Sequence, residues 1–366
     1  MIKYLGSKRR LVPVLGAMLD ACGARTALDL FTGTTRVAQE FKRRGAHVTA
    51  VDTASYAEVF GRCWIELDAA AADRVELHDA LAHLNALTGE PGYFTEAFCV
   101  RARYLQPFNG ARVDAIREAI ESDYRATWLH PVLLTALLLA ADRVDSTTGL
   151  QMAYLKEWAE RSYRPLQLLA PELIDGDGRS IRADAREVVG HLPPVDLAYL
   201  DPPYNQHRYF TNYHVWETLV RWDQPQAYGV AMKRIDSRDD ATKSPFNSKR
   251  LMPGALREVI AAVDCELMLL SYNNESWLTR DELIAACAQR GHVEILDVAS
   301  RRYIGAQIGI YSPSGQRVGD IGHLRNVEHL VIAGDRDLVH RVAEAGREAV
   351  DRIAATASTS SRTAHA

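Results

Sequence analysis

The sequence contains 366 residues, of which 47% are hydrophobic and 25% charged, and its formal net charge is -4. These values are ordinary for a soluble globular enzyme of one large or two smaller domains, with enough apolar residues for a sizeable core. The slight negative charge excludes a strongly basic nucleic-acid-binding protein. Any contact with a polyanion therefore has to come from local basic patches.

The cysteines and the apolar runs argue against a disulfide-linked or zinc-binding protein and against a membrane protein. The five cysteines are odd in number, widely spaced and without a Cys-x-x-Cys pair, which indicates reduced thiols rather than a disulfide framework or a zinc site. The longest apolar run, residues 131–141, is too short to span a bilayer, and no signal-type apolar stretch follows the basic N-terminus. We therefore expect a cytoplasmic protein that contacts no membrane.

The first predicted element is a basic loop that enters a helix. Residues 2–10 are basic and contain glycine, and apolar residues at helical spacing follow over residues 11–19, with Ser7 as the candidate N-cap. Lys8 stands near the start of this helix, where the helix dipole disfavours a cation. An anionic partner, such as the carboxylate of a ligand, would explain this position. The alternative is a solvated basic N-terminus.

A strand, a turn of small residues and a helix follow. Residues 27–31 are predicted as a strand, Gly33 lets the backbone of the turn approach a ligand, and residues 36–41 begin a helix. A second strand, residues 47–51, ends at Asp52, where nucleoside-binding α/β proteins hold the ribose hydroxyls. Because the turn lacks the complete Gly-x-Gly-x-x-Gly pattern, a single nucleoside is favoured over a dinucleotide. Alternatively, Asp52 caps the next helix.

From residue 57 to residue 173 the pattern is helical and the strand signals stop. Apolar residues recur at three-to-four spacing over residues 112–124, 131–144 and 151–159. An all-helical insertion between two halves of a sheet is typical of a lid or a specificity module. Its arginines alternate with aromatic residues, a mixture suited to phosphates and grooves. Its acidic residues make ordinary pairing within helices an equally good explanation.

Strand signals return at residues 180–184 and again at residues 195–200. Asp184 could accept a hydrogen bond from the adenine amino group of a ligand or cap the next helix. Residues 195–200 are almost continuously apolar, which is typical of a strand covered on both faces. Pro202 and Pro203 lack N–H donors and cannot continue a central strand. The chain must therefore leave the sheet at its carboxyl edge, where ligands bind in open α/β sheets.

Asp201 and Tyr204 at this edge suit the alkylation of a planar amino group. The nitrogen of such a group is a poor nucleophile because its lone pair is delocalised into the ring. The Asp201 carboxylate and a backbone carbonyl of Pro202 or Pro203 could accept both N–H hydrogens and free the lone pair, while Tyr204 stacks on the ring. The alternative is a tight turn in which Asp201 bonds its own backbone, but the preceding buried strand favours the chemistry.

The chain after Tyr204 is first aromatic and then basic. Residues 205–214 are dense in aromatic and hydrogen-bonding side chains, among them Tyr209. Residues 225–250 carry a local excess of three positive charges, six basic against three acidic side chains, which suits a polyanionic substrate. A solvated loop without a specific role is the alternative. The basic residues expected to contact the substrate are Lys233, Arg234 and Lys249.

The remaining sequence completes the sheet and predicts an α/β protein. A strand over residues 266–271 and a helix over 279–290 come first. Residues 293–298 and 328–333 are expected to form a closing antiparallel pair. A helix over residues 335–355 and a disordered tail rich in Ser, Thr and Ala end the chain.

These motifs, in this order, resemble those of the DNA adenine methylase (Dam-like) family over roughly residues 2–333. The matching positions are Tyr4 and Lys8 in the opening motif, Phe31 and Gly33 in the glycine motif, Asp52 as the ribose carboxylate, and Asp201, Pro202, Pro203 and Tyr204 in the most specific motif. Thr35 departs from the pattern, because many members of the family have a second glycine at this position.

The resemblance implies a Rossmann-like methyltransferase sheet, mostly parallel with one antiparallel strand, and an inserted helical domain. The implied domains are an S-adenosylmethionine-binding catalytic domain over residues 1–56 and 178–335, a helical target-recognition insertion over 57–177, and a C-terminal helix with a disordered tail over 336–366. The implied activity is direct transfer of a methyl group from S-adenosylmethionine to the 6-amino group of adenine in duplex DNA after base flipping. No metal and no covalent enzyme intermediate are implied.

The resemblance also suggests a role for each site residue. The methyl donor is expected to contact Tyr4, Lys8, Phe31, Gly33, Asp52, Asp184 and Asp201. The flipped adenine and the DNA are expected to contact Asp201, Pro202, Pro203, Tyr204, Tyr209, Lys233, Arg234 and Lys249. A companion restriction endonuclease would be a further partner.

Other functions stay open at this point. The same motif serves amino groups of adenine or guanine in structured RNA, and a catalytically silent subunit could bind the donor and nucleic acid without transfer. Protein glutamine methylases fit less well, because their motif usually begins with Asn where this chain has Asp201.

Overall fold

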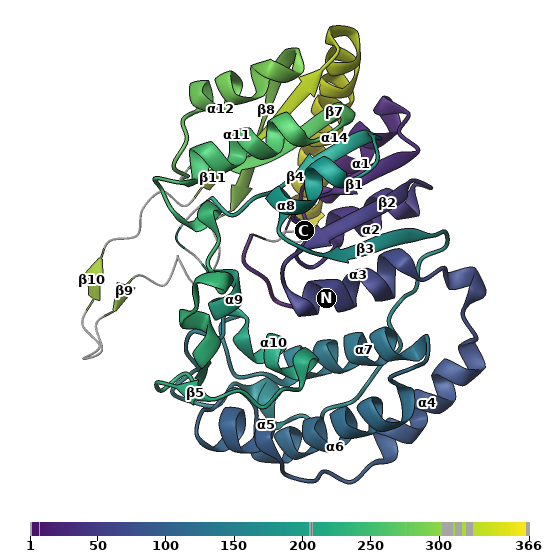
Figure 1. The fold of residues 1–366 in the computed structure, drawn as a ribbon, viewed down its shortest axis with the longest axis vertical. Coiled ribbons are helices and arrows are strands. Elements are labelled where there is room, and N and C mark those ends of the chain that lie inside the picture. Colours follow the sequence, from purple (N-terminus) through teal and green to yellow (C-terminus); the bar gives the residue numbers. More distant parts are fainter. Residues whose placement is uncertain are drawn as a thin grey trace.

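The computed structural model describes residues 2–6, 8–204, 206, 208–274, 276–301, 310–311, 317–319 and 325–363, so the predicted N-cap Ser7 lies outside the described residues. The centre of the protein is a seven-stranded sheet with helices on both faces, and a larger group of helices lies beyond one of its edges (Figure 1). Among the helices that the structure describes, none combines the length and the apolar character needed to cross a bilayer.

The sheet confirms the predicted fold class. Its strand order is β3-β2-β1-β4-β7-β11-β8. Its strands are β1 (Thr26–Asp29), β2 (His47–Asp52), β3 (Gly178–Arg182), β4 (Val195–Leu200), β7 (Cys265–Asn273), β8 (His292–Arg301) and β11 (Arg325–Gly334). β11 is antiparallel to both of its neighbours, as the predicted closing pair requires, and the other pairs are parallel. Two small hairpins pair β5 (Ala227–Tyr228) with β6 (Lys233–Arg234) and β9 (Ile310–Tyr311) with β10 (Arg317–Gly319).

β4 lies between β1 and β7, and this central position explains its apolar sequence. Leu197 and Tyr199 belong to the hydrophobic cluster on one face of the sheet, and Ala198 and Leu200 belong to the cluster on the other. A strand covered on both faces needs apolar side chains at successive positions. The pairing with β7 ends at Leu200, so Asp201 is the first residue beyond the carboxyl edge of the sheet.

Helices from distant parts of the chain cover the two faces. The face that includes Leu197 is covered by α1 (Val12–Cys22), α2 (Arg36–Arg43) and α14 (Arg336–Thr363). The opposite face is covered by α8 (Ala185–Val188), α11 (Met252–Ala262) and α12 (Arg280–Cys287). α12 begins at a capping box in which the side chains of Thr279 and Glu282 each bond the other residue's backbone N–H. This start agrees with the helix predicted over residues 279–290.

Between β2 and β3, every regular element of the fully described residues 57–177 is helical. The helices here are α3 (Ser55–Gly61), α4 (Arg74–Ala86), α5 (Tyr93–Thr95), α6 (Pro107–Tyr124) and α7 (Leu129–Val144), with π-helical turns at Arg62–Glu66 and Glu96–Val100. α7 is buried around most of its circumference, as its leucine-rich sequence predicts. Its side chains belong to the same hydrophobic cluster as those of α1 and β4. That residues 57–177 act as a separate recognition domain stays a prediction.

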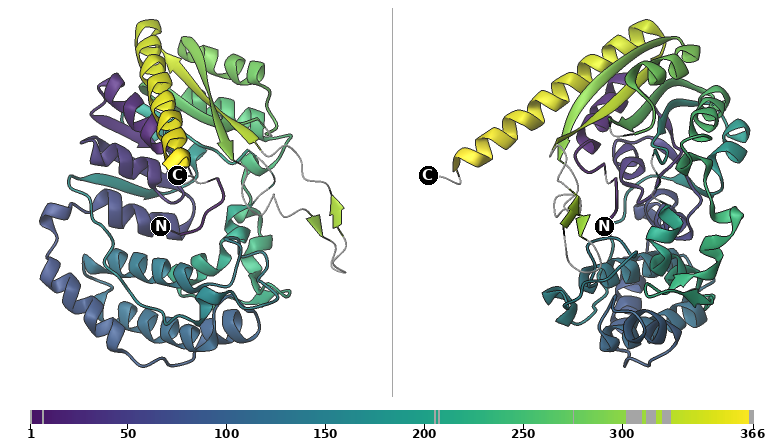
Figure 2. Two further views of the ribbon diagram at one scale, coloured as in Figure 1. Left: turned by 180° about the vertical axis from the view of Figure 1, so that it is seen from behind. Right: turned by 90° about the vertical axis from the view of Figure 1, so that its left-hand side faces the viewer.

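Two predicted elements differ from the structure. Residues 151–159 do not form a helix, because tertiary hydrogen bonds hold their backbone: Gln151 N donates to the Asn212 carbonyl at 2.9 Å and Leu155 N to the Ser146 carbonyl at 3.0 Å. The C-terminal helix α14 is longer than predicted and continues to Thr363. Its far end projects beyond the rest of the chain (Figure 2). The tail predicted after residue 355 is therefore helical over residues 356–363.

The chain after β4 returns to the helical part before it completes the sheet. α9 (Tyr209–Asn212) and α10 (His214–Arg221) follow the Asp-Pro-Pro-Tyr motif, and α10 packs against α3 and α7 (Figure 1). Residues 225–250, predicted as a basic loop, consist of the β5–β6 hairpin and short 3-10 turns. The motif after β4 therefore lies where the sheet and the helical part meet.

Candidate active site

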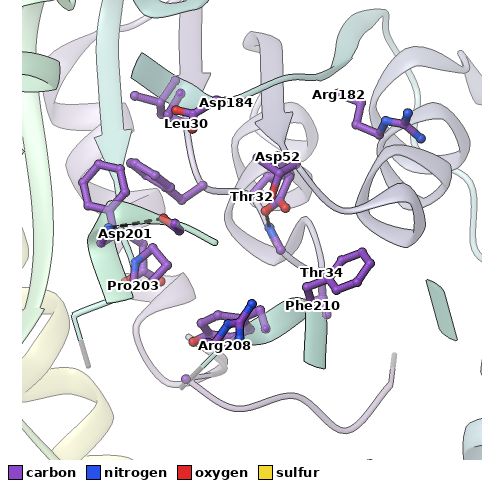
Figure 3. Close-up of a pocket in the computed structure, with 18 of the residues that line it drawn as sticks. Leu30, Thr32, Thr34, Asp52, Arg182, Asp184, Asp201, Pro203, Arg208 and Phe210 are labelled. Carbon is purple, nitrogen blue, oxygen red and sulfur yellow. Dashed lines mark hydrogen bonds between the residues drawn. The ribbon is translucent and has the colours of Figure 1, made fainter. Parts of the chain in front are cut away.

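A pocket of about 320 Å³ opens at the carboxyl edge of the sheet, between residues that follow β1, β2, β3 and β4 and residues of the segment 208–247 (Figure 3). Its volume lies within the roughly 300–1,000 Å³ that is typical of small-molecule sites. Nine predicted site residues line it: Tyr4, Lys8, Phe31, Gly33, Asp52, Asp184, Asp201, Pro203 and Tyr209. Residues predicted separately along 200 positions of the sequence therefore share one pocket.

The turn between β1 and α2 forms one wall of this pocket. Gly33 has φ +52° and Thr35 has φ 60°. A β carbon on Gly33 would lie 3.1 Å from the Tyr4 ring, so the missing side chain lets this ring pack on the turn. Thr35 is buried and holds a left-handed conformation that glycine adopts without strain. Its hydroxyl donates to the Thr34 carbonyl and accepts from Gln39, and these hydrogen bonds fix the threonine in this conformation.

Asp52 at the end of β2 is fixed by local backbone groups. Its Oδ2 accepts a hydrogen bond from Gly33 N at 2.8 Å, and its Oδ1 accepts one from Ala54 N at 3.0 Å. Burial raises the pKa of the Asp52 carboxyl, although these N–H groups oppose the shift. The carboxylate therefore joins the glycine turn to β2 and bonds Ala54, the N-cap residue of α3. The capping alternative is not met, because no side chain within the fully described residues 8–204 caps α3.

Asp29, the last residue of β1, is a pocket residue that the sequence analysis missed. Its Oδ2 accepts hydrogen bonds from the Thr32 hydroxyl at 2.9 Å and from Ala38 N at 3.1 Å. Its Oδ1 is buried and has no hydrogen-bond partner among the described residues. Burial raises the pKa of Asp29 to about 7. A buried carboxylate oxygen without a partner on a pocket wall is suited to a donor group of a ligand. Its place just before a glycine turn was the sequence signal.

Asp184 follows β3 and also lines the pocket. Its Oδ1 accepts a hydrogen bond from Arg186 N at 2.9 Å and caps α8. The helix-capping alternative is therefore correct for this residue. Because a carboxylate has two oxygens, capping leaves acceptor capacity for a ligand.

Asp201 is held by a buried ion-pair network. Lys8 Nζ lies 3.0 Å from Asp201 Oδ1 and 2.5 Å from Glu328 Oε1, and Ser271 Oγ donates to the same glutamate oxygen at 2.6 Å. Burial raises the pKa of Asp201 to about 6; Lys8 opposes this shift and Glu328 adds to it. The second Asp201 oxygen makes none of the ion pairs recorded among the described residues.

This network corrects the role predicted for Lys8. Its position in the sequence predicted a ligand carboxylate as the partner of its ammonium group, but in the structure its anionic partners are Asp201 and Glu328 of the chain itself. Lys8 is only 8% exposed. Glu328, on β11, is a site residue that the sequence analysis missed. No local pattern could have identified it, because it lies 320 residues from Lys8 in the sequence.

Tyr204 packs beside this network. Its ring centroid lies 5.3 Å from that of Tyr272 at an interplanar angle of 59°, and Lys8 Nζ lies 5.6 Å from the Tyr204 centroid. Asp201 and Pro203 line the pocket, whereas Tyr204 and Pro202 are not among the described residues that do. A Tyr204 ring that stacks on a ligand base therefore has to turn away from Tyr272.

Tyr209 belongs to an aromatic cluster that fixes the N-terminal segment. The Tyr4 ring stacks on Tyr213 with centroids 4.6 Å apart and on Tyr209 with centroids 5.3 Å apart. Leu5 N donates to the Tyr213 hydroxyl at 2.6 Å. Residues 4–5 are thereby attached to the start of α10, next to the pocket.

The three basic residues predicted to contact DNA differ in their surroundings. Arg234 is 1% exposed, and its guanidinium lies 2.7 Å from carboxylate oxygens of Asp223 and of Asp236. Its charge is therefore used inside the protein, and the prediction that it contacts the substrate is corrected. Lys249 is exposed just before α11, and Lys233 is partly exposed in β6. Neither of them lines the pocket in the described part of the chain.

Two of the arginines that line the pocket have a buried nitrogen that makes no hydrogen bond to the residues that the structure describes. Arg36, at the start of α2, and Arg208, just before α9, both line the pocket, and the Nε atom of each is buried without a hydrogen-bond partner among the described residues. Burial lowers the pKa of Arg36, and Arg9 lowers it further. Together with the pocket carboxylates, these donors suit a ligand that carries both positive and negative charge.

The strand order, the carboxylate at the end of β2 and the Asp-Pro-Pro-Tyr motif after β4 agree with the class that the sequence resembles, methyltransferases that modify amino groups. More narrowly, the chain belongs to the D12 class N6 adenine-specific DNA methyltransferase family, whose model matches residues 4–285. The family suggested by the sequence motifs is thereby confirmed.

Curated relatives agree with this family. The modification methylase StsI of Streptococcus sanguinis is 29% identical over 323 residues, which cover 82% of this chain and 49% of that protein. The type II methyltransferase M.NlaIII of Neisseria lactamica is 28% identical over 318 residues, 82% of this chain and 92% of that protein. The type II methyltransferase M.FokI of Planomicrobium okeanokoites is 24% identical over 325 residues, 82% of this chain and 49% of that protein. The chain thus spans about half the length of the StsI and FokI enzymes and most of the NlaIII enzyme.

Proposed function

We propose that this protein transfers a methyl group from S-adenosylmethionine to the 6-amino group of adenine in duplex DNA. The observation that supports the proposal most directly is that Asp201, Gly33 and Asp52 line one pocket. A group that activates an amino nitrogen and a site for the donor nucleoside therefore face each other. Membership of an N6 adenine-specific family supplies the position of methylation.

The polar groups of the pocket fit S-adenosylmethionine. Asp52 would hold the ribose hydroxyls, and the second oxygen of Asp184 would accept from the adenine amino group. The partnerless Oδ1 of Asp29 would accept from the methionine ammonium, and Arg36 would hold the methionine carboxylate in place of Lys8. When bound, the donor supplies a methyl group on a positively charged sulfur, which needs no further activation.

Asp201 would prepare the target amino group. Its Oδ1 is paired with Lys8, which leaves Oδ2 to accept one N–H of the adenine, while a carbonyl of Pro202 or Pro203 accepts the other. With both hydrogens held, the nitrogen lone pair becomes available for attack on the methyl carbon. As the N–C bond forms, the methyl–sulfur bond would break and leave the donor as a neutral thioether, and Asp201 can take the proton that the nitrogen then loses. Glu328 shares the Lys8 charge, so Lys8 positions Asp201 without fully neutralising it.

An adenine inside a duplex cannot reach this pocket, so the reaction requires base flipping. We propose that Tyr204 leaves its contact with Tyr272 and stacks on the flipped base, and that Tyr209 limits the space beside it. Lys249 and Lys233 would contact DNA phosphates, whereas Arg234 would hold the segment that carries Lys233.

The cellular setting is part of the same proposal. DNA as substrate favours a location in the cytoplasm. The names of the StsI, NlaIII and FokI relatives describe modification or type II enzymes, and for this chain we propose a companion restriction endonuclease that recognises the same site.

The test is incubation of the purified protein with methyl-labelled S-adenosylmethionine and separate pools of duplex DNA, structured RNA and protein. We expect label in duplex DNA only, as N6-methyladenine at one recognition sequence. Label in RNA alone, or donor binding without transfer to any pool, would overturn the proposal. Asp201→Ala serves as the control for contaminating activity.

A further inference from the structure

Two histidines and a glutamate form a cluster far from the pocket. Ligand atoms of His292, Glu294 and His340 all lie within 4.8 Å of one another. His292 and Glu294 belong to the first residues of β8, the edge strand, and His340 belongs to the first turns of α14. β8 and β4 run in the same direction, so the cluster lies at the amino end of the sheet and the pocket at its carboxyl end. The cluster therefore has no place in the methyl transfer proposed above.

The two periodicities of strand and helix explain why these side chains meet. Alternate residues of a strand share one face, so His292 and Glu294 point to the same side as Leu296. That side is covered by α14, because a β carbon on Gly346 would lie 3.0 Å from Leu296. On α14, His340 lies six residues before Gly346, on the turns that cross the start of β8. The contact between His292 and His340 joins residues 48 positions apart in the sequence, and it depends on the packing of α14 against β8.

The two oxygens of Glu294 have different surroundings. Oε2 faces Arg347, whose two terminal nitrogens lie 3.2 Å and 3.3 Å away. Oε1 faces both imidazoles: it bonds His340 Nδ1 and lies 3.9 Å from His292 Nε2. His292 Nε2 is buried and has no hydrogen-bond partner among the described residues. The ring centroids of the two histidines are 4.8 Å apart. Three ligand atoms thus lie within 4.8 Å of one another, and His292 Nε2 has no hydrogen-bond partner in the described part of the chain.

We propose that His292, Glu294 and His340 bind a divalent transition metal ion of the zinc type. Two imidazole nitrogens and one carboxylate oxygen are a common zinc donor set, which leaves a fourth position for water. Zinc bonds of about 2.0–2.2 Å separate tetrahedral ligand atoms by about 3.3–3.5 Å, so ion binding requires the three side chains to adjust to this spacing. Arg347 holds the carboxylate from its other oxygen, as an outer partner of a metal ligand does. His340 is half exposed, which gives an ion access from solvent.

The bound ion would join the C-terminal helix to the edge strand of the sheet. Without an ion, Glu294 would still bond Arg347 and His340. The competing explanation is therefore an ion-pair cluster that binds no metal.

Metal binding is tested on the full-length chain, produced without a histidine tag and stripped with a chelator. In equilibrium dialysis against zinc chloride at pH 7.5, we expect one saturable equivalent. With cobalt(II) in place of zinc, we expect visible absorption bands of a four-coordinate site. Zinc should raise the melting temperature of the protein. Absence of a saturable equivalent in the folded wild-type protein would overturn the proposal and favour the ion-pair cluster.

Variants locate the site. His340→Gln should remove the saturable equivalent and the zinc-dependent rise in melting temperature. The matched control is His329→Gln, which disrupts another histidine–carboxylate pair of the sheet, 2.7 Å from Asp297, and should bind zinc as the wild type does. Arg347→Gln should weaken binding by roughly 10–100-fold, the effect of losing an outer partner. Equal zinc binding by wild type and His340→Gln would place the ion elsewhere and overturn the assignment.

Discussion

Two of the carboxylates that line the pocket, Asp52 and Asp201, are held in different ways. Asp52 accepts hydrogen bonds from backbone N–H groups of Gly33 and Ala54, both within 19 residues in the sequence. Asp201 is held through Lys8, which Glu328 holds in turn from the antiparallel strand β11. The first arrangement is local and relies on backbone donors. The second depends on side chains that only the complete sheet brings together.

This difference indicates a division of tasks across the pocket. Backbone N–H groups are fixed by the strand and the turn, so the wall with Asp52 is preformed, which suits the donor site proposed above. The charge that faces Asp201 depends on two ionisable side chains, Lys8 and Glu328, so the strength of Asp201 as an acceptor can be adjusted by mutation or pH. The following predictions separate the two walls.

The largest effect is expected for Asp201→Ala. This change removes the acceptor for the target amino group but leaves Lys8 paired with Glu328. We expect kcat/KM for DNA methylation to fall by about 10²–10⁴-fold, the usual contribution of a positioned acid–base group. The dissociation constant for S-adenosylmethionine, measured by calorimetry, should change little. An Asp201→Ala enzyme with normal turnover would contradict the assignment.

Lys8→Met should mainly affect stability. It leaves Asp201 and Glu328, both largely buried, without a counter-ion, and breaking a buried pair costs about 3–5 kcal/mol. Urea unfolding measures the loss. The double variant Lys8→Met with Glu328→Gln should recover part of it, because one of the unpaired charges is gone. If the double variant were no more stable than Lys8→Met, Glu328 would not belong to the network.

Asp52→Asn tests the other wall. It keeps the shape of the side chain but removes the charge, and a hydrogen bond to a charged group contributes about 1.5–3 kcal/mol. We expect S-adenosylmethionine to bind about 10–100-fold more weakly, with kcat at saturating donor close to wild type. Asp184→Asn is the matched control and should weaken binding less. A large loss of kcat in Asp52→Asn would break the division between the two walls.

The smallest effect is a shift in the pH profile. Asp201 acts when ionised, and burial raises its pKa to about 6, so kcat/KM for the wild type should fall as the pH drops through about 6. Glu328→Gln removes a negative charge that raises this pKa. Asp201 then becomes the only charged partner of Lys8 in the network described above. The acidic side of the pH profile of kcat/KM should therefore move to lower pH. The maximal kcat/KM should fall, because Asp201 becomes a weaker acceptor. A shift of the acidic side to higher pH would contradict this reading of the network.

The sequence was sufficient for the parts of the site that depend on local order. The apolar strand before Asp201, the prolines after it, and the carboxylate at the end of the second strand each have a local pattern with a physical cause. The alternation of strand and helix signals was enough for the sheet, including its antiparallel closing pair. The helix predicted over residues 151–159 failed because Gln151 and Leu155 bond the distant Asn212 and the nearby Ser146 instead of a helical turn.

What the tertiary structure decided is the partner of each charge. The sequence positions of Lys8 and Arg234 predicted an anionic ligand for the first and a DNA phosphate for the second. In the structure both side chains form ion pairs with carboxylates of the chain. Spacing along the sequence cannot specify such pairs, because Coulomb attraction acts through space. Glu328 is close to Lys8 because β11 pairs with β7 in the folded sheet. The sequence by itself determined the strands, the motifs and the edge of the sheet where they meet. The folded chain alone decided which charges stay free for a ligand and which are already paired.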